Sequence, residues 1–593
     1  MTNQKLRICI HIAAPLVIVV FFISFLYSKY PYVGPDYSYF IPRILDTYIH
    51  YQVNGLSIQW YTPSWGGGLP AYPNPQQIQF SLPQFLTFII DPWEASVLST
   101  IFFMLLGYFA MYRFATRTLG WQWQAGILGA IFFTINGFYI EHMIVGHVSF
   151  QAFPLLPLIA LALFSASLPA AVSAIIIALI LAAAIYGAGF YILVIFILSL
   201  AVALPALYLH NNKIFNFKRI ISISLLASLF FFILAGSRIF AVYSFMRFFP
   251  RQISDNYPIS MVQGLLAMAR QLLGVMGLVP LRILRGQNVN TLRTYFSGAY
   301  KTDYGVWEFD TALTPMLWVF LAYGILFHPY PGKQSFTKAF HHVDKWVAAG
   351  MLLFAVYVAI EFTQAKGLIY PSLQKLPILS SLHVNVRFVS AFIFPLAILG
   401  AYGCEKAIAK HEFLAKPIPF IFIVVLALAP VLFYFSFGKD LWGRWFDLNL
   451  SLQSYQKIRE GQISPVKNVI DNQDLNLLPD SSNLYMFEPV FGYNNEDFRP
   501  KVQPGPVNEV QNDYFNMTNP ASLVYPEENQ LQLFERIRLA EKSQFQDFTN
   551  RRQPDWKRPV MQTLLDRVAE ISLIIFSLIL MHFLLNKMRL VLK

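Results

Sequence analysis

The chain has 593 residues, of which 56% are hydrophobic, 16% aromatic and only 13% charged. This composition excludes a soluble globular protein and indicates a protein that crosses the membrane several times. The net charge of +12 is explained by Lys and Arg residues beside the expected spans, so we expect no nucleic-acid partner.

About twelve apolar segments reach or approach the length of roughly 17 to 25 residues that a bilayer requires. In chain order they are 8–27, 96–115, 125–140, 152–168, 170–186, 190–209, 220–240, 313–327, 347–362, 388–407, 418–437 and 571–585. Prolines and a glycine pair interrupt the region between the first of these spans and residue 220, where re-entrant or broken helices are an alternative. We therefore expect an all-α polytopic membrane protein.

The positive charges predict the orientation of these spans. If the N-terminus, with Lys5 and Arg7, is cytoplasmic, the other inner connections also carry Lys or Arg, apart from the short neutral link 165–169. This agrees with the positive-inside rule. We expect a multi-pass protein of the cytoplasmic membrane, with its site facing the periplasm or the exterior.

The expected chain organisation has three parts. Residues 1–437 form the membrane domain, with a large first external loop at 28–95, and residues 571–593 form the last span and a cytoplasmic tail. Between them, 438–570 is rich in polar residues and long enough for an extracytoplasmic domain of ~100 residues, whose structural class is mixed or uncertain. The apolar segment 261–284 contains Arg270, Gln271 and Arg282, so we interpret it as interfacial or partly buried in an external loop rather than as a span.

Asp36 directly follows the first span. The aromatic and aliphatic residues of 37–51 predict a helix that lies flat at the membrane surface. A carboxylate at this depth can take the proton of a hydroxyl beside a lipid-borne substrate, so Asp36 is our candidate general base. Alternatively, Asp36 caps the predicted helix, because Asp is a favoured N-cap residue. The two roles can coexist.

Glu141, His142 and His147 cluster in the second external turn. We expect Glu141 and His147 to orient an acceptor or, together with Asp36, to hold a divalent metal such as Mg²⁺ or Mn²⁺. No second acid forms an Asp-x-Asp motif with Asp36. The alternative, which we favour for His142, is an interfacial imidazole that is hydrogen-bonded to the backbone.

Four arginines are candidates for binding a leaving phosphate. Arg238, Arg247 and Arg251 lie on or just beyond the span 220–240, and Arg387 begins a later span. A guanidinium binds phosphate through two parallel hydrogen bonds and stays charged at physiological pH. The alternative for Arg247 and Arg251 is contact with anionic headgroups, whereas Arg387 starts an apolar run and needs a partner.

Trp65 stands in the first external loop and is followed by Gly66, Gly67 and Gly68. An indole there is expected to stack on a sugar face, although anchoring at the membrane interface is an equal alternative. The three glycines are expected to let the loop pass close to the membrane or to a sugar.

Several of these motifs resemble one known family. Asp36 after the first span, Trp65-Gly-Gly-Gly-Leu-Pro70, Asn136-Gly-Phe-Tyr-Ile-Glu-His-Met-Ile-Val-Gly-His147 with Pro154-Leu-Leu-Pro157, and the segment 376–388 look like the YfhO-like bacterial membrane proteins of the GT-C glycosyltransferase superfamily. The resemblance implies a GT-C-like fold and inverting transfer of a sugar from a polyprenyl-phosphate donor to a glycan, lipid or protein acceptor outside the cytoplasm. It also implies that Asp36 is the acid of the first external loop.

Two other functions stay open at this point. One is an exporter or flippase of lipid-linked saccharide or polysaccharide, and the other is a structural envelope protein without catalysis. The halves of the chain show no obvious repeat and the ionisable residues gather outside, which favours a transferase over a transporter. A second acid facing Asp36 would favour the enzyme, whereas a continuous polar path through the membrane would favour the exporter.

Overall fold

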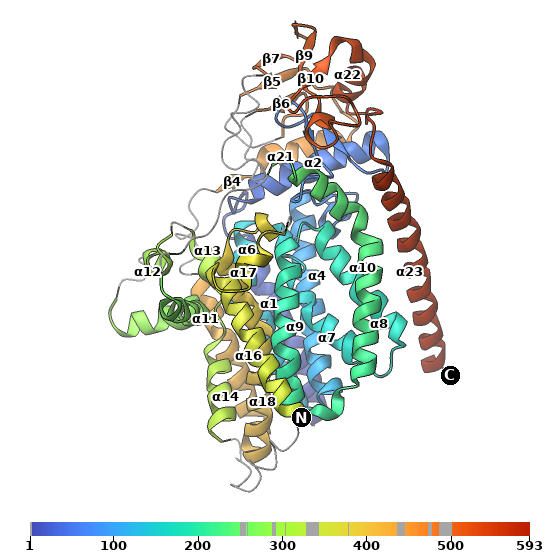
Figure 1. The fold of residues 1–593 in the computed structure, drawn as a ribbon. Coiled ribbons are helices and arrows are strands. Elements are labelled where there is room, and N and C mark those ends of the chain that lie inside the picture. Colours follow the sequence, from blue (N-terminus) through green and yellow to red (C-terminus); the bar gives the residue numbers. More distant parts are fainter. Residues whose placement is uncertain are drawn as a thin grey trace.

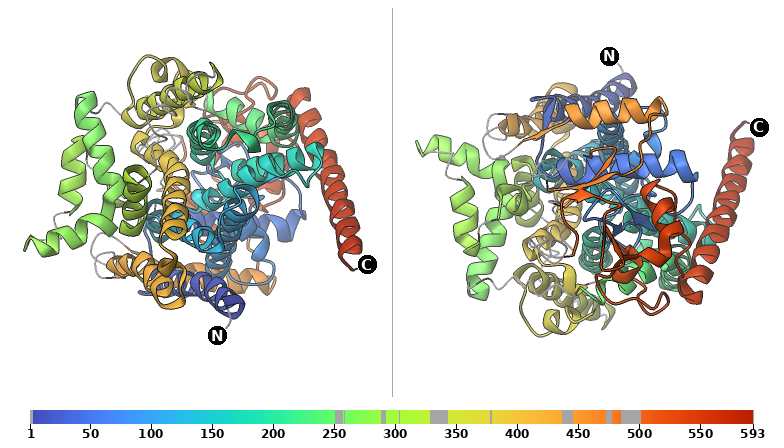
Figure 2. Two further views of the ribbon diagram at one scale, coloured as in Figure 1. Left: turned by 90° about the horizontal axis from the view of Figure 1, so that it is seen from below. Right: turned by 90° about the horizontal axis from the view of Figure 1, so that it is seen from above.

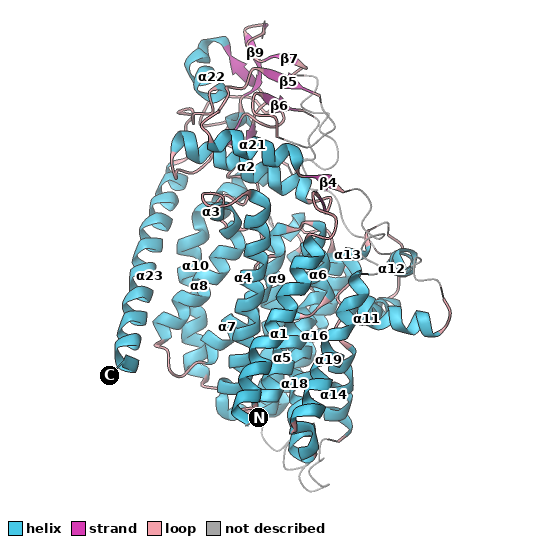
Figure 3. Cartoon of the chain, turned by 180° about the vertical axis from the view of Figure 1, so that it is seen from behind, coloured by secondary structure: helices cyan, strands magenta, loops and turns pink. Residues whose placement is uncertain are grey.

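The computed structural model describes residues 3–249, 257, 259–287, 292–302, 304–327, 343–376, 379–435, 445–471, 477–484 and 501–592. Long helices run side by side, and a small sheet-containing region covers one end of the bundle (Figure 1). The start of the first helix and the end of the last helix both point away from this region (Figures 1 and 3). The fold is thus a polytopic helical bundle with a smaller domain at one end.

Each of the twelve expected spans contains a helix of this bundle. Their bounds are α1 (Asn3–Leu26), α4 (Pro92–Arg113), α5 (Trp123–Thr134), α7 (Leu156–Phe164), α8 (Ala170–Tyr186), α9 (Phe190–His210), α10 (Phe217–Met246), α14 (Pro315–Leu326), α16 (Val343–Gln364), α18 (Ile393–Lys410), α19 (Pro417–Leu428) and α23 (Val560–Leu592). Within the described residues, nine helices are long and apolar enough to cross a membrane, and four shorter apolar helices accompany them.

One of these nine long helices is α11 (Met261–Leu284), which was expected to be interfacial. Its length and composition are those of a span, but Gly274 has a left-handed φ of 45° that breaks the helix into two parts. Figures 1 and 2 show α11 and its neighbour α12 (Leu292–Tyr300) lying across the direction of the bundle helices. The orientation therefore agrees with an interfacial helix.

Shorter helices connect the bundle to the end that the sheet-containing region covers. We call this end the outer end, after the expected orientation, and the described residues of 438–570 the outer domain. They are α2 (Tyr37–Asn54), α3 (Leu82–Leu86), α6 (Gly137–Val145), α13 (Val306–Phe309), α17 (Tyr370–Leu373), α21 (Asn449–Arg459) and α22 (Lys542–Thr549). A π-helical turn, η1 (Phe114–Thr118), continues α4, and the 3-10 helices are η2 (Val148–Phe150), η3 (Phe153–Leu155), η4 (Asn212–Ile214), η6 (Leu379–Ser381), η7 (Asn385–Phe392), η8 (Glu412–Ala415), η9 (Ala429–Val431), η11 (Pro520–Leu523) and η12 (Leu539–Glu541).

The described strands are short and form small sheets. Two three-stranded sheets lie in the outer domain: β5 (Asn468–Ile470) pairs in parallel with β6 (Ser481–Asn483) and antiparallel with β7 (Gly505–Pro506), and β9 (Tyr514–Thr518) pairs antiparallel with β8 (Val510–Gln511) and β10 (Arg536–Arg538). Antiparallel pairs join β1 (Tyr32–Val33) to β4 (Phe446–Asp447), and β2 (Tyr61–Thr62) to β3 (Leu69–Pro70).

The first external loop and the outer domain pack into one unit. Gly67 donates its N–H to Ser482 Oγ at 3.0 Å and accepts from Thr518 N through its carbonyl at 2.7 Å. A Cβ on Gly67 would come within 2.7 Å of the Val502 side chain, and its φ is +70°. Gly67 and Gly68 therefore let the loop approach the outer domain, and an approach of this loop to the membrane or to a sugar stays a prediction.

Helix α2 forms the floor of this outer unit. It begins at Tyr37, close to the predicted start, and most of its residues are buried. The view from above shows it lying across the bundle beneath the outer domain (Figure 2). A buried ion pair fixes it there, because Asp46 Oδ1 lies 3.5 Å from Arg551 Nη1 of the outer domain, and both side chains are 3% exposed.

Candidate functional site

Two glycines bring Asp36 to His147. Gly34 precedes α2 and Gly146 ends α6 with a φ of +109°, and a Cβ on either glycine would overlap backbone atoms of the other segment. The Asp36 N–H donates to the Val145 carbonyl at 2.9 Å. In this close contact of the two backbones, the Asp36 carboxylate lies against His147 Nε2.

The Asp36 side chain does not serve as a helix cap. Asp36 occupies the N-cap position of α2, but its carboxylate makes no capping hydrogen bond. Its Oδ2 atom contacts His147 instead, and 40% of the side chain is exposed. Within the described part of the chain, Oδ1 has no hydrogen-bond partner. The carboxylate is therefore both held in place and accessible.

A buried ion pair lies beside this contact. Arg387 lies on η7, which leads directly into α18. It donates from Nε and Nη2 to the two carboxylate oxygens of Glu308 on α13, both at 2.5 Å. The Arg387 and Glu308 side chains are 12% and 7% exposed. Burial alone raises the pKa of the Glu308 carboxyl, but the charge and hydrogen bonds of Arg387 hold it well below its usual value. Glu308 is therefore an anion here.

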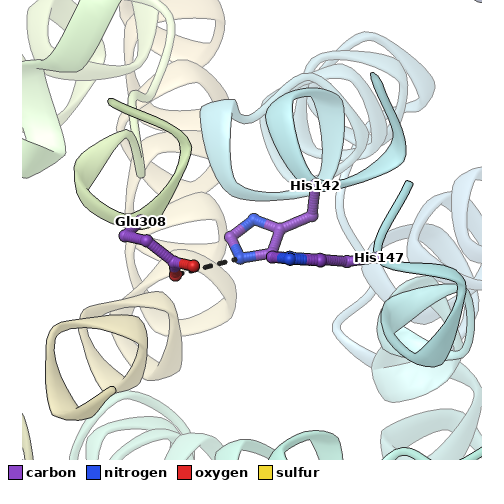
Figure 4. Close-up of side chains that lie close together, drawn as sticks. All are labelled: His142, His147 and Glu308. Atoms are coloured by element: carbon purple, nitrogen blue, oxygen red, sulfur yellow. Dashed lines mark ion pairs between the residues drawn. The ribbon is translucent and has the colours of Figure 1, made fainter. Parts of the chain in front are cut away.

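His142 lies between the Asp36–His147 contact and the Glu308–Arg387 ion pair. Its Nδ1 lies 2.7 Å from the Phe138 carbonyl, as expected for an imidazole bonded to the backbone, and its Nε2 lies 3.7 Å from Glu308 Oε2. The His142 and His147 ring centroids are 4.9 Å apart, and Figure 4 shows both rings turned toward Glu308. Burial lowers the pKa of His142 to about 4, so this imidazole is neutral at physiological pH.

His147 and Arg387 also line a cavity of about 130 Å³ at the outer end of the bundle. Its other walls come from the first external loop, from the start of α9 and from α10, and they include Phe40, Val242 and Met246. The Arg387 guanidinium lies over the rings of Phe150 and Tyr191, at 5.1 and 4.9 Å from their centroids. The cavity thus joins an imidazole and a cation to an apolar wall.

Glu141 is not among the residues that line this cavity. It is fully buried on α6 and lies within electrostatic range of Tyr434, whose hydroxyl donates to Asp310 at 2.5 Å. Adjacent residues on an α-helix project about 100° apart, so Glu141 and His142 face different neighbours. The structure brings Asp36 and His147 together and places Glu141 elsewhere.

The arginines expected at the phosphate site lie in different surroundings. Arg238 is buried, and its Nη2 donates to the carbonyls of Asn74 and Gln77 at 2.7 and 2.8 Å. Arg247 is exposed just after α10, with its guanidinium 4.5 Å from the Phe248 ring centroid. Arg251 lies outside the described residues. Of this group, Arg387 alone is described as lining the cavity.

Trp65 is buried in the contact between the first loop and the outer domain. It is 3% exposed and pairs through its backbone with Asn483. The Arg43 guanidinium lies 5.5 Å from its ring centroid. Trp65 does not line the cavity that contains His147.

Glu308 was not singled out from the sequence. It stands in Val306-Trp-Glu-Phe-Asp310, an acid flanked by aromatic residues shortly before a span. That setting is itself a signal, because a carboxylate in an apolar segment near the membrane needs a partner. Arg387 needs a partner for the same reason, but no local pattern pairs residues that are 79 positions apart.

Three side chains of this cluster could hold a metal ion. His142, His147 and Glu308 each offer one ligand atom, and these atoms lie within 4.8 Å of one another. Two of the three residues are imidazoles, a donor type that suits transition metals better than Mg²⁺. This set differs from the expected set of Asp36, Glu141 and His147, with which it shares only His147.

Comparison with known proteins gives one structural similarity. No protein-family model and no curated protein matches the sequence. The fold is similar to the cryo-EM structure of the arabinofuranosyltransferase AftD from Mycobacteria, with a TM-score of 0.44 and 13% sequence identity. The match covers 82% of this chain but only 32% of that one, so this chain spans about a third of the length of AftD.

Proposed function

We propose that this protein is an integral membrane glycosyltransferase that moves a sugar from a polyprenyl-phosphate-linked donor to an acceptor outside the cytoplasm. The observation that carries the proposal is the exposed Asp36 carboxylate, held by His147 beside a cavity that Arg387 also lines. A base and a phosphate-binding cation are the groups that this chemistry requires.

In the proposed reaction Asp36 is the general base. His147 Nε2 donates to Oδ2 and orients the carboxylate, which leaves Oδ1 for the hydroxyl of the acceptor. As the acceptor oxygen bonds to the anomeric carbon, its proton passes to Asp36. The bond from the anomeric carbon to the phosphate oxygen breaks, and its electron pair leaves with the polyprenyl phosphate. Attack from the side opposite the phosphate inverts the anomeric centre.

Arg387 is the proposed partner of the leaving phosphate. Its Nε and Nη2 atoms are occupied by Glu308, and among the described residues Nη1 has no hydrogen-bond partner. The ion pair with Glu308 fixes the direction of the guanidinium, which lowers the entropic cost of binding an anion. Phe40, Val242 and Met246 on the apolar wall are suited to the first isoprene units of the donor.

A second acid at the cluster supports the enzyme over the exporter. Glu308 lies 3.7 Å from His142 Nε2, and the His142 ring lies 4.9 Å from the ring of His147, the partner of Asp36. Two carboxylates in different settings, one exposed and one buried in an ion pair, are typical of catalytic sites in which one acts as a base and the other positions charge. An exporter has no need of a base at this place.

The acceptor is proposed to approach over the outer domain. A cleft of about 500 Å³ there is lined by Lys501, Tyr514, Phe534 and Arg536, among others. Lys501 Nζ and Arg536 Nη2 donate to backbone carbonyls, at 3.3 and 3.2 Å, so no carboxylate cancels their charge in these contacts. Glu535 also lines the cleft, but its carboxylate is paired with Arg538 at 2.7 Å. Aromatic rings beside the cations of Lys501 and Arg536 favour an anionic saccharide.

This cleft is linked to the cavity through α10. Phe534 contacts Phe249, just beyond the end of α10, with ring centroids 5.6 Å apart. Val242 and Met246 of the same helix line the cavity that contains His147. An acceptor bound in the cleft would therefore have its reacting end close to the outer end of α10.

The test is transfer of radiolabelled sugar from a panel of polyprenyl-phosphate donors by the purified protein. Wild type is expected to consume at least one donor, and Asp36→Asn is expected to lose transfer while remaining folded. A parallel assay follows labelled lipid across liposome membranes. If lipid crosses and no donor is consumed, the transferase is refuted and the exporter takes its place.

A further inference from the structure

The cluster of His142, His147 and Glu308 has unused buried nitrogen atoms. His142 Nε2 and His147 Nδ1 are both buried and lack a hydrogen-bond partner within the described residues. Figure 4 shows the two imidazoles and the Glu308 carboxylate converging on one space. An unpaired polar atom in a buried position is costly, and an ordered water, a ligand or a bound ion can satisfy it.

The partner of His142 decides where its lone pair points. A backbone carbonyl only accepts hydrogen bonds, so His142 Nδ1, at 2.7 Å from the Phe138 carbonyl, must carry the proton. In the neutral imidazole Nε2 then has a lone pair. That lone pair lies 3.7 Å from the Glu308 carboxylate, and two electron-rich groups so close together repel unless a cation stands between them.

His147 repeats this arrangement with a different partner. The Asp36 carboxylate accepts the proton of Nε2, which leaves the lone pair of the neutral ring on the buried Nδ1. Histidine ligands of metal ions are usually oriented in this way, with the second ring nitrogen donating to a carbonyl or a carboxylate. Both imidazoles of the cluster have such an outer partner.

The charges of the cluster also favour a cation. With neutral imidazoles, Asp36 and Glu308 contribute two negative charges and Arg387 one positive charge. The bidentate contact of Arg387 with Glu308 leaves further lone pairs on both carboxylate oxygens. A divalent ion would change the net charge from −1 to +1, which suits a site for a phosphate.

We propose that His142 Nε2, His147 Nδ1 and a Glu308 oxygen bind one divalent transition-metal ion, with Asp36 and the Phe138 carbonyl as outer partners of the imidazoles. Two nitrogens and one oxygen favour Zn²⁺ over Mg²⁺, Ca²⁺ and Mn²⁺, which prefer oxygen ligands. The use of the ion in catalysis rests on the proposed function: when bound, it would supply a positive charge for the phosphate. Its binding does not depend on that function.

The spacing requires a small adjustment. Ligand atoms of a tetrahedral Zn²⁺ ion are ~3.4 Å apart at bond lengths of 2.0–2.1 Å, whereas one ligand atom from each of the three residues lies within 4.8 Å of the others. Rotations about side-chain bonds have to close a gap of up to ~1.4 Å. The fourth position remains for water or substrate.

The experiment measures metal binding by the full chain in detergent, in the absence of donor and acceptor. The protein is treated with chelator, dialysed and titrated with Co²⁺, which is followed by its visible absorption, and with Zn²⁺ in competition. Metal bound per chain is measured by mass spectrometry after gel filtration. The variants are His142→Gln, His147→Gln, Glu308→Gln and Asp36→Asn. The control is His411→Gln, at a half-buried histidine just after α18.

Wild type is expected to bind one ion per chain, and each ligand variant is expected to weaken binding at least tenfold. Asp36→Asn, which changes an outer partner, is expected to weaken it by about 10- to 100-fold, and His411→Gln not at all. Glu141→Gln separates this ligand set from the one expected from the sequence, because it should leave the affinity unchanged.

Absence of stoichiometric binding by wild type overturns the site, and this result does not depend on the folding of any variant. Binding that survives both histidine substitutions, or is lost in Glu141→Gln and kept in Glu308→Gln, also overturns it. A protein that binds the ion but transfers no sugar keeps the metal site and loses the proposed function. A wild-type protein that transfers sugar but binds no ion keeps the proposed function and loses the metal site.

Discussion

The buried pair of Glu308 and Arg387 allows stability and activity to be separated. Removing one partner of a buried ion pair leaves an uncompensated charge and typically costs about 3–5 kcal/mol. Both side chains here are nearly buried and joined by two hydrogen bonds of 2.5 Å. We therefore expect Arg387→Met, which strands the Glu308 carboxylate, to lower the free energy of unfolding by about 4–5 kcal/mol.

Glu308→Leu should cost less than Arg387→Met. The Arg387 guanidinium keeps its contacts with the faces of Phe150 and Tyr191, and each such cation–π contact is worth about 0.5–2 kcal/mol. We expect a loss of about 3 kcal/mol. The double variant Glu308→Leu/Arg387→Met removes both charges and fills the space with apolar atoms. Its free energy of unfolding should therefore lie within about 1 kcal/mol of the wild-type value.

The assay is reversible unfolding in mixed micelles for all four proteins, together with sugar transfer. The double variant is expected to recover stability but not transfer, because the proposed function needs the Arg387 cation. If the double variant loses as much free energy of unfolding as the two single variants together, the unpaired buried charge is not the cause of their lower stability. If it transfers sugar at the wild-type rate, Arg387 does not bind the phosphate.

Three further predictions follow. Asp36→Asn should lower transfer by about 10²- to 10⁴-fold, the usual contribution of a general base, with little change in unfolding, since Asp36 makes no capping hydrogen bond. Gly146→Ala should destabilise the protein by about 2–5 kcal/mol, because a φ of +109° strains alanine and its Cβ would meet Tyr37; thermal unfolding in detergent measures this. Arg536→Gln should raise the KM for an anionic acceptor about two- to fivefold and leave kcat unchanged.

Each of these three predictions has a matched control variant. Asp344→Asn changes an exposed acid on α16 and should keep full transfer. Gly55 has a φ of +67° but a Cβ there would meet no atom within 4 Å. Gly55→Ala should therefore lower the stability only through backbone strain. Arg552→Gln, on a side chain that is 70% exposed, should leave the acceptor KM unchanged. Equal effects in a variant and its control would contradict the corresponding prediction.

The sequence by itself determined the helical membrane architecture. Apolar runs of bilayer length are a local property, because a helix in the membrane satisfies its own backbone hydrogen bonds. For this reason each of the twelve expected segments contains a helix. The start of α2 at Tyr37 could also be predicted, because it depends on the pattern of neighbouring residues.

The site depended on contacts that no local pattern contains. Asp36 meets His147 because Gly34 and Gly146 let two backbones approach across more than a hundred residues. Glu308 and Arg387 meet because α13 packs beside the outer end of the α18 segment. The sequence could show that Arg387 needed a partner, since an unpaired charge near the membrane is costly. Only the tertiary structure decided that the partner is Glu308 and that Glu141 lies elsewhere.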